Sequence, residues 1–199
     1  MNVFISWSGT RSRLAAEAFH RILPMILTTP NEKFYLSTGI YKGANWNANL
    51  NKGLQIADFG ILCVTRDNYA APWMIYEAGF LAHKAGADKV APFLLDISPS
   101  ELRGPVTQFQ STVFEKEDLR KLVFAINRLQ EAPVRESYLS SNFDMAYDTL
   151  AEHLRKASDF QDEEGIEDMA RKTLAGVEKL LNLSTENQSL LREIMSGLK

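Results

Sequence analysis

One acidic side chain stands in an otherwise apolar segment of the chain. Glu77 is the only acid in residues 68–87, and its nearest neighbours in the sequence are aromatic and aliphatic. A carboxylate among apolar groups destabilises a fold unless it is paired or used in chemistry. Helical spacing places Trp73 at i−4 and Leu81 at i+4 on the same face as Glu77. The carboxylate is therefore either a reacting group or a structural one that caps a loop or pairs with a lysine or arginine.

The turn after the first expected strand has groups that bind phosphate. Residues 6–10 read Ser-Trp-Ser-Gly-Thr and open an expected helix, with Arg11 and Arg13 close in sequence. The positive end of a helix and its N–H groups favour an anion. An ordinary helix cap explains the same residues. Trp7, just past a strand tip, suits stacking on a flat ring as well as it suits packing.

Other familiar chemistries lack their motifs. The three histidines, His20, His83 and His153, are far apart and have no cysteine or carboxylate at ligand spacing, so we expect no metal site. The glycine-rich fingerprints of nucleotide triphosphatases and Rossmann domains and the Gly-x-Ser-x-Gly motif of hydrolases are missing from the sequence. Phosphoryl transfer and hydride transfer therefore have little support.

The elements that must position these residues alternate between strand and helix through the first 130 residues. Short apolar runs predict strands at 3–5, 34–36, 60–64, 90–95 and 112–114, and apolar periodicity predicts helices around 14–23, 46–54, 72–82 and 116–129. This pattern predicts an α/β fold with a flavodoxin-like parallel sheet, whose ligands lie at the carboxyl ends of the strands. Gly79, inside the third helix, predicts a close backbone approach.

After Pro133 the strands stop and helical periodicity continues. Apolar stripes predict helices at 143–154, 166–181 and 185–195. These stripes either fold back on the first domain or form a unit that joins protomers or receives a partner. Residues 1–130 contain 14 Lys and Arg against 11 Asp and Glu, and residues 131–199 contain 8 against 14. The first region is too weakly basic to predict a nucleic-acid partner.

Composition is that of an ordinary globular protein. The chain has 199 residues, of which 45% are hydrophobic and 24% charged. Cys63, its only cysteine, lies in an apolar run, which predicts a buried structural thiol and a reducing compartment. No basic leader precedes the first apolar stretch, and no apolar run approaches the roughly 18 residues that span a bilayer. We therefore expect a cytoplasmic protein without a membrane partner.

Four segments together resemble one family. Residues 3–8, 37–46, 60–65 and 71–79 are similar to the opening strand and loop, the second loop and helix, the third strand and the following helix of Toll/interleukin-1 receptor (TIR) domains, particularly the prokaryotic ones. The last segment contains the Trp-x-x-x-Glu spacing of many catalytic TIR domains, as Trp73 and Glu77. The resemblance implies a TIR domain at 1–132, with helices on both faces of a five-stranded parallel sheet, and a helical extension at 133–199.

Many TIR domains of this kind cleave the nicotinamide–ribose bond of NAD, by hydrolysis, by cyclisation or by transfer of ADP-ribose. The resemblance implies that Glu77 is the catalytic carboxylate and that NAD is the substrate, with no separate cofactor. It assigns substrate binding to a set of residues on the loops around this position: Ser6, Trp7, Ser8, Gly9, Ser37, Trp46 and Trp73. One stabilising carboxylate is sufficient, because nicotinamide leaves as a neutral molecule while the ribose acquires oxocarbenium character.

The resemblance also implies self-association. The loop after the second strand joins protomers in the family and often carries an acid, where this chain has Ser37-Thr38-Gly39-Ile40, so Tyr41 and Lys42 are expected to serve assembly. The implied setting is bacterial antiphage or stress signalling, with an effector protein that reads the product. Two alternatives remain: a non-catalytic TIR assembly module with a structural Glu77, and an enzyme similar to nucleoside deoxyribosyltransferases.

Overall fold

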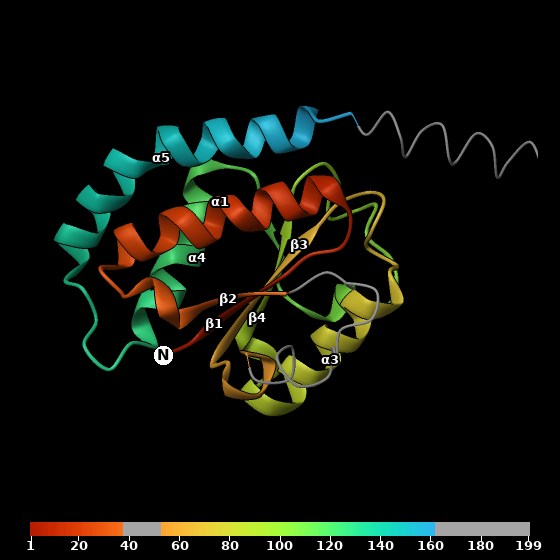
Figure 1. Cartoon of the computed structure of the whole chain (residues 1–199), viewed down its shortest axis with the longest axis horizontal. Coiled ribbons are helices and arrows are strands. Elements are labelled where there is room, and N and C mark those ends of the chain that lie inside the picture. Colours follow the sequence, from red (N-terminus) through yellow and green to blue (C-terminus); the bar gives the residue numbers. More distant parts are fainter. Residues whose placement is uncertain (38–52, 162–199) are drawn as a thin grey trace, which may run out of the picture. The chain divides into compact units, whose positions relative to one another are not determined.

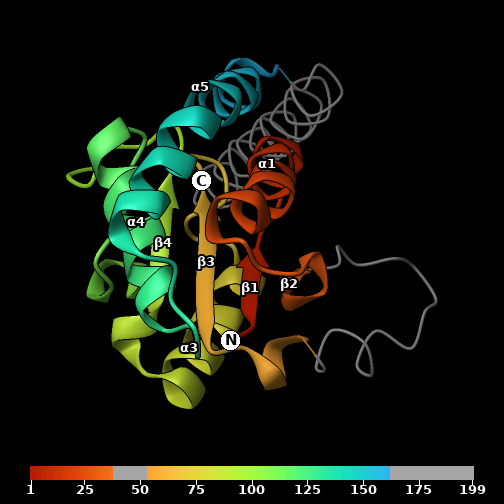
Figure 2. The same ribbon diagram turned by 90° about the vertical axis from the view of Figure 1, so that its left-hand side faces the viewer.

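Five parallel strands form a single sheet. The computed structural model describes residues 1–37 and 53–161, and its strands are β1 (Val3–Ser6), β2 (Phe34–Leu36), β3 (Phe59–Val64), β4 (Val90–Leu94) and β5 (Thr112–Val113). Their order is β2-β1-β3-β4-β5, so β1 lies between β2 and β3 (Figure 2). Phe4 is in register with Tyr35 on one side and with Gly60 on the other. This arrangement confirms the α/β fold and the flavodoxin-like strand order expected from the sequence.

The two faces of the sheet have separate cores, because successive strand residues point to opposite faces. Val3 and Ile5 pack with α1 (Thr10–Leu27) and α4 (Lys116–Arg128), whereas Phe4 packs with α3 (Pro72–Ala85) on the other face (Figure 1). All six residues of β3 are buried, as expected for a strand covered on both sides. Cys63 has no exposed surface, and burial raises the pKa of its thiol, which confirms the buried structural cysteine.

Helix α3 begins at Pro72, whose missing N–H is tolerated in the first turn. Its close approach to the sheet occurs at Gly60 of β3, where an added Cβ would lie 2.5 Å from Cδ1 of Leu81. The expectation of a close approach at Gly79 is wrong: Gly79 is exposed, and a Cβ there would meet no atom within 4 Å. The small residue that the helix needs is therefore on the strand and not on the helix.

Helix α5 (Glu136–Asp159) covers α1 and α4 on the side away from the sheet (Figure 1). The side chains that it buries recur at helical spacing: Leu139, Phe143, Leu150, Ala151, Leu154 and Ala157. The first apolar stripe of the expected extension thus folds back on the domain, which was one of its two alternatives. The compact unit continues past the expected boundary at residue 133 and ends at Phe160.

Some expected elements lie outside the described residues. They include the loop after Ser37, most of the helix at 46–54 with Trp46, and the two helices at 166–181 and 185–195. Residues 53–56 are helical, and Leu54 is buried in the core beneath α3. In the ranges that the structure describes, no helix has the length and apolar character needed to cross a bilayer.

Candidate functional site

Glu77 lies in the second turn of α3 and has no exposed surface. The amphipathic pattern of the helix explains this position, because Met74, Ala78 and Leu81 on the same face are buried against the sheet. A carboxylate among these residues enters the core together with them. It therefore needs hydrogen-bond partners inside the protein.

Three neutral donors hold the carboxylate. Ser6 donates its hydroxyl to Oε2 at 2.5 Å, and Ser37 donates its hydroxyl to Oε1 at 2.8 Å. The indole Nε1–H of Trp73 also donates to Oε1, at 2.8 Å. The i−4 spacing of Trp73 and Glu77 thus brings the two side chains into contact, as the sequence predicts.

The two serines come from neighbouring strands. Ser6 ends β1, and Ser37 follows directly after β2, so both lie at the carboxyl edge of the sheet. The backbone N–H of Ser37 donates to the carbonyl of Ile5 at 2.8 Å, which extends the pairing of the two strands by one residue. Both serines are buried. The resemblance implies that Ser6 and Ser37 bind substrate, whereas in the structure their hydroxyls donate to Glu77.

Burial controls the protonation of Glu77. Removal from water raises the pKa of its carboxyl group, and the three hydrogen bonds oppose this increase without cancelling it. In the described part of the chain, no lysine or arginine forms an ion pair with Glu77, and no backbone N–H donates to it. Among the described residues, Glu77 therefore has no basic partner, and the groups that it binds are two serine hydroxyls at the carboxyl edge of the sheet and one indole N–H.

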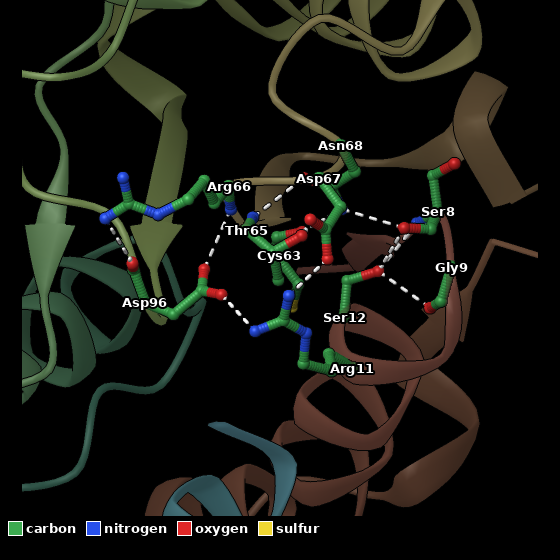
Figure 3. Close-up of polar contacts among 10 residues, drawn as sticks. All are labelled: Ser8, Gly9, Arg11, Ser12, Cys63, Thr65, Arg66, Asp67, Asn68 and Asp96. Carbon is green, nitrogen blue, oxygen red and sulfur yellow. Dashed lines mark hydrogen bonds and ion pairs between the residues drawn. The ribbon is translucent and has the colours of Figure 1, made fainter. Parts of the chain in front are cut away.

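The β1–α1 loop forms a tight turn beside this position. Gly9 has a φ of 88°, a left-handed conformation that favours glycine, and α1 begins at the next residue. The Ser12 hydroxyl lies 2.6 Å from the Ser8 carbonyl and 2.9 Å from the Gly9 carbonyl, and accepts the Ser8 N–H at 2.9 Å (Figure 3). Ser8 is half-buried and Gly9 is exposed, so part of this loop faces solvent.

Arg11 is held by two acids. Its guanidinium pairs with Asp96 at 2.5 Å and also with Asp67, which follows β3 (Figure 3). Asp96 accepts the backbone N–H of Arg66 at 2.8 Å as well. The positive charge of Arg11, which the sequence placed near a phosphate, is therefore compensated within the protein. Arg13 pairs with Glu17 one turn along α1.

Asn68 is a site residue that sequence reasoning missed. Its side chain is buried and joins the loop after β3 to the β1–α1 loop, as Figure 3 shows. The polar run Thr65-Arg66-Asp67-Asn68, directly after a wholly buried strand, was the signal that could have found it. Polar residues at that point of a parallel sheet lie at the edge where ligands bind.

The three tryptophans have different surroundings. Trp7 is half-buried and packs against the core beneath α1, on the other face of the sheet from Glu77. Trp73 lies beside the carboxylate, and its ring centroid is 5.2 Å from that of Tyr76, which is half exposed. Trp46 is outside the described residues.

The sequence matches no protein-family model, and a search of curated proteins finds no relative. Across residues 1–37 and 53–161, no three His, Cys, Asp or Glu side chains are grouped so that they could hold a metal ion.

Proposed function

We propose that the chain is an enzyme of the TIR family that cleaves the nicotinamide–ribose bond of NAD, giving nicotinamide and an ADP-ribose product. The observation that carries this proposal is the Glu77 carboxylate, which is buried at the carboxyl edge of β1 and β2 and pairs with no lysine or arginine of residues 1–37 and 53–161. Structural carboxylates in cores are usually paired with a base, whereas desolvated, perturbed ones are typical of reacting sites.

The chemistry requires a negative charge and no acid. As the bond between the ribose carbon and the pyridinium nitrogen breaks, its electron pair neutralises the nicotinamide, and positive charge develops on the ribose. An ionised Glu77 would stabilise this charge in a medium of low dielectric constant. A nucleophile then adds to the same carbon: water gives ADP-ribose, a group of the substrate gives a cyclic product, and in each case one proton is released.

Glu77 retains capacity for a ribose hydroxyl. An ionised carboxylate offers about four acceptor sites. From the described residues, Oε1 receives two hydrogen bonds and Oε2 receives one, which leaves Oε2 with more capacity for a further donor. Because the side chain has no exposed surface, NAD must displace part of the wall around it on binding. We propose that the half-buried Trp73 side chain moves aside when NAD binds.

The remaining assignments depend on the same resemblance. We propose that Ser8 and Gly9 approach the NAD phosphates, and that the protein works in the cytoplasm of bacteria in antiphage or stress signalling. Self-association through its TIR surfaces and an effector that reads the product belong to this proposal.

A second function has one observation in its favour. The carboxylate of Glu77 is wholly buried and hydrogen-bonded by three neutral donors, which also suits a structural residue of a non-catalytic TIR assembly module. The two functions differ in a simple assay.

The test is incubation of the purified full chain with NAD over a range of protein concentrations, with chromatography and mass analysis of the products. Release of nicotinamide with an ADP-ribose product supports the enzyme, and its dependence on protein concentration reports self-association. Parallel incubation with deoxynucleosides tests the deoxyribosyltransferase-like alternative. Intact NAD and intact deoxynucleosides at every protein concentration would leave the assembly module as the function.

A further inference from the structure

One buried side chain fastens the β1–α1 loop to the rest of the sheet edge. Asn68 is 3% exposed and lies in the loop after β3, 60 residues from Ser8 in the sequence. Its Nδ2 donates to the carbonyl of Ser8 at 2.9 Å and to the carbonyl of Cys63 at 3.0 Å. Its Oδ1 accepts the backbone N–H of Thr65 at 2.7 Å. Both N–H groups and the oxygen of the amide are thus used.

The other links between these loops are more exposed. Arg11 ties the first turn of α1 to Asp67, whose side chain is 60% exposed so that this pair contributes little, and to Asp96, whose side chain is 14% exposed. Both pairs hold Arg11 and do not contact Ser8. Ser12 holds Ser8 and Gly9 only to its own helix. Among the described residues, Asn68 is therefore the buried side chain that links the Ser8 carbonyl to the end of β3.

We propose that Asn68 is a positioning residue of the candidate site, which holds the β1–α1 loop in the arrangement that receives the diphosphate of NAD. The proposal rests on the proposed function, because it takes its ligand from there. Asn68 itself touches the loop and not the substrate. Its removal should therefore weaken binding of the diphosphate more than it slows the chemistry at Glu77.

Asn68→Asp replaces the amide NH2 group by an oxygen, so that a hydrogen-bond donor becomes an acceptor. One carboxylate oxygen still accepts the Thr65 N–H, but the other faces the carbonyl oxygens of Ser8 and Cys63, which repel it. Asn68→Ala removes the same bonds without placing a negative charge there, and serves as the second variant if the Asp variant does not fold.

Asn127 provides a control that matches Asn68 in residue type and burial but lies away from the β1–α1 loop. Asn127, near the end of α4, is 4% exposed and binds one backbone segment in the same way. Its Nδ2 donates to the Val134 carbonyl at 2.9 Å, and its Oδ1 accepts the Val134 N–H at 2.9 Å. Asn127→Asp and Asn127→Ala should therefore lower stability in a similar way without moving the β1–α1 loop.

The experiment measures all four variants as full chains. Calorimetry gives the Kd of ADP-ribose, steady-state kinetics give kcat and KM for NAD, and hydrogen exchange reports the amides of residues 8–11. We expect the Asn68 variants to raise both Kd and KM about tenfold or more and to speed exchange in the loop, with kcat changed less. The Asn127 variants should stay within about twofold of the parent for both constants.

Two results would overturn the inference, and they are distinguishable. If the parent cleaves NAD but the Asn68 and Asn127 variants bind ADP-ribose equally well, Asn68 has only a structural role and the proposed function stands. If the parent neither binds ADP-ribose nor cleaves NAD, the proposed function fails and the ligand of this inference fails with it.

Discussion

Replacement of Glu77 by Gln separates its chemical role from its structural one. The amide has the same shape, its oxygen can accept from Ser37 and Trp73, and its nitrogen can donate to the Ser6 oxygen. The negative charge is lost while the geometry is kept. Loss of one such electrostatic contact lowers the rate by about 10²–10³-fold, so NAD cleavage should fall by that factor.

The free energy of unfolding of Glu77→Gln should rise, although its rate of NAD cleavage falls. Because burial raises the pKa of Glu77, the folded protein binds this proton more tightly than the unfolded chain does. Above pH 4.5 the unfolded chain releases this proton more readily than the folded protein does, so the buried carboxyl group destabilises the fold and Glu77→Gln should be more stable than the parent at neutral pH. This advantage should shrink as the pH falls through the raised pKa, and it should vanish below the ordinary value of 4.5.

Glu77→Ala is the contrasting substitution. It leaves the hydroxyls of Ser6 and Ser37 and the indole N–H of Trp73 without this acceptor, and it opens a cavity. Each of the two buried serine hydroxyls costs about 1–3 kcal/mol without its acceptor, so the free energy of unfolding should fall by about 2 kcal/mol or more. The two variants are thus expected to be equally inactive but to move stability in opposite directions.

Urea unfolding of the parent and both variants between pH 4 and pH 8, with NAD turnover at pH 7, measures these effects. A Gln variant that cleaves NAD at the parent rate would refute the catalytic assignment. A Gln variant that is destabilised at neutral pH as much as the Ala variant would refute the argument from burial of the charge.

Three further predictions follow from neighbouring contacts. Ser6→Ala removes a donor that lowers the Glu77 pKa, so the acidic limb of the kcat profile should move to higher pH; an unchanged limb would contradict this coupling. Trp7→Ala should lower the Tm, since Trp7 packs against the core beneath α1, and a large rise in KM for NAD at unchanged Tm would instead show stacking on substrate. A chain of residues 1–160 should keep the Tm of the domain. A chain of residues 1–133 should melt at a lower temperature and aggregate, because it lacks α5, whose buried side chains such as Phe143 contribute about 1.5–3 kcal/mol each. Circular dichroism measures the two Tm values and light scattering measures aggregation, and equal Tm values would contradict the stabilising role of α5.

Local patterns in the sequence determined the elements of the fold. Five apolar runs became five parallel strands, and Leu14 to Leu23 belong to the amphipathic α1. Glu77 stood out because a charge in an apolar helix is unusual, and Cys63 was identified as buried from its neighbours. These features depend on residues within a few positions of each other, which is the range over which periodicity and composition carry information.

The composition of the site was decided only by the tertiary structure. Ser6 and Ser37 reach Glu77 across 71 and 40 residues, and Asn68 reaches Ser8 across 60. Long-range packing also determines that Trp7 lies on the face of the sheet opposite Glu77 and that α5 belongs to the domain. It likewise determines that the close contact between α3 and the sheet is at Gly60 and not at Gly79. The order of strands sets which loop ends meet, and the alternation of side chains across the sheet sets which face each one takes. Both are properties of the assembled sheet, so no single segment of the sequence contains them.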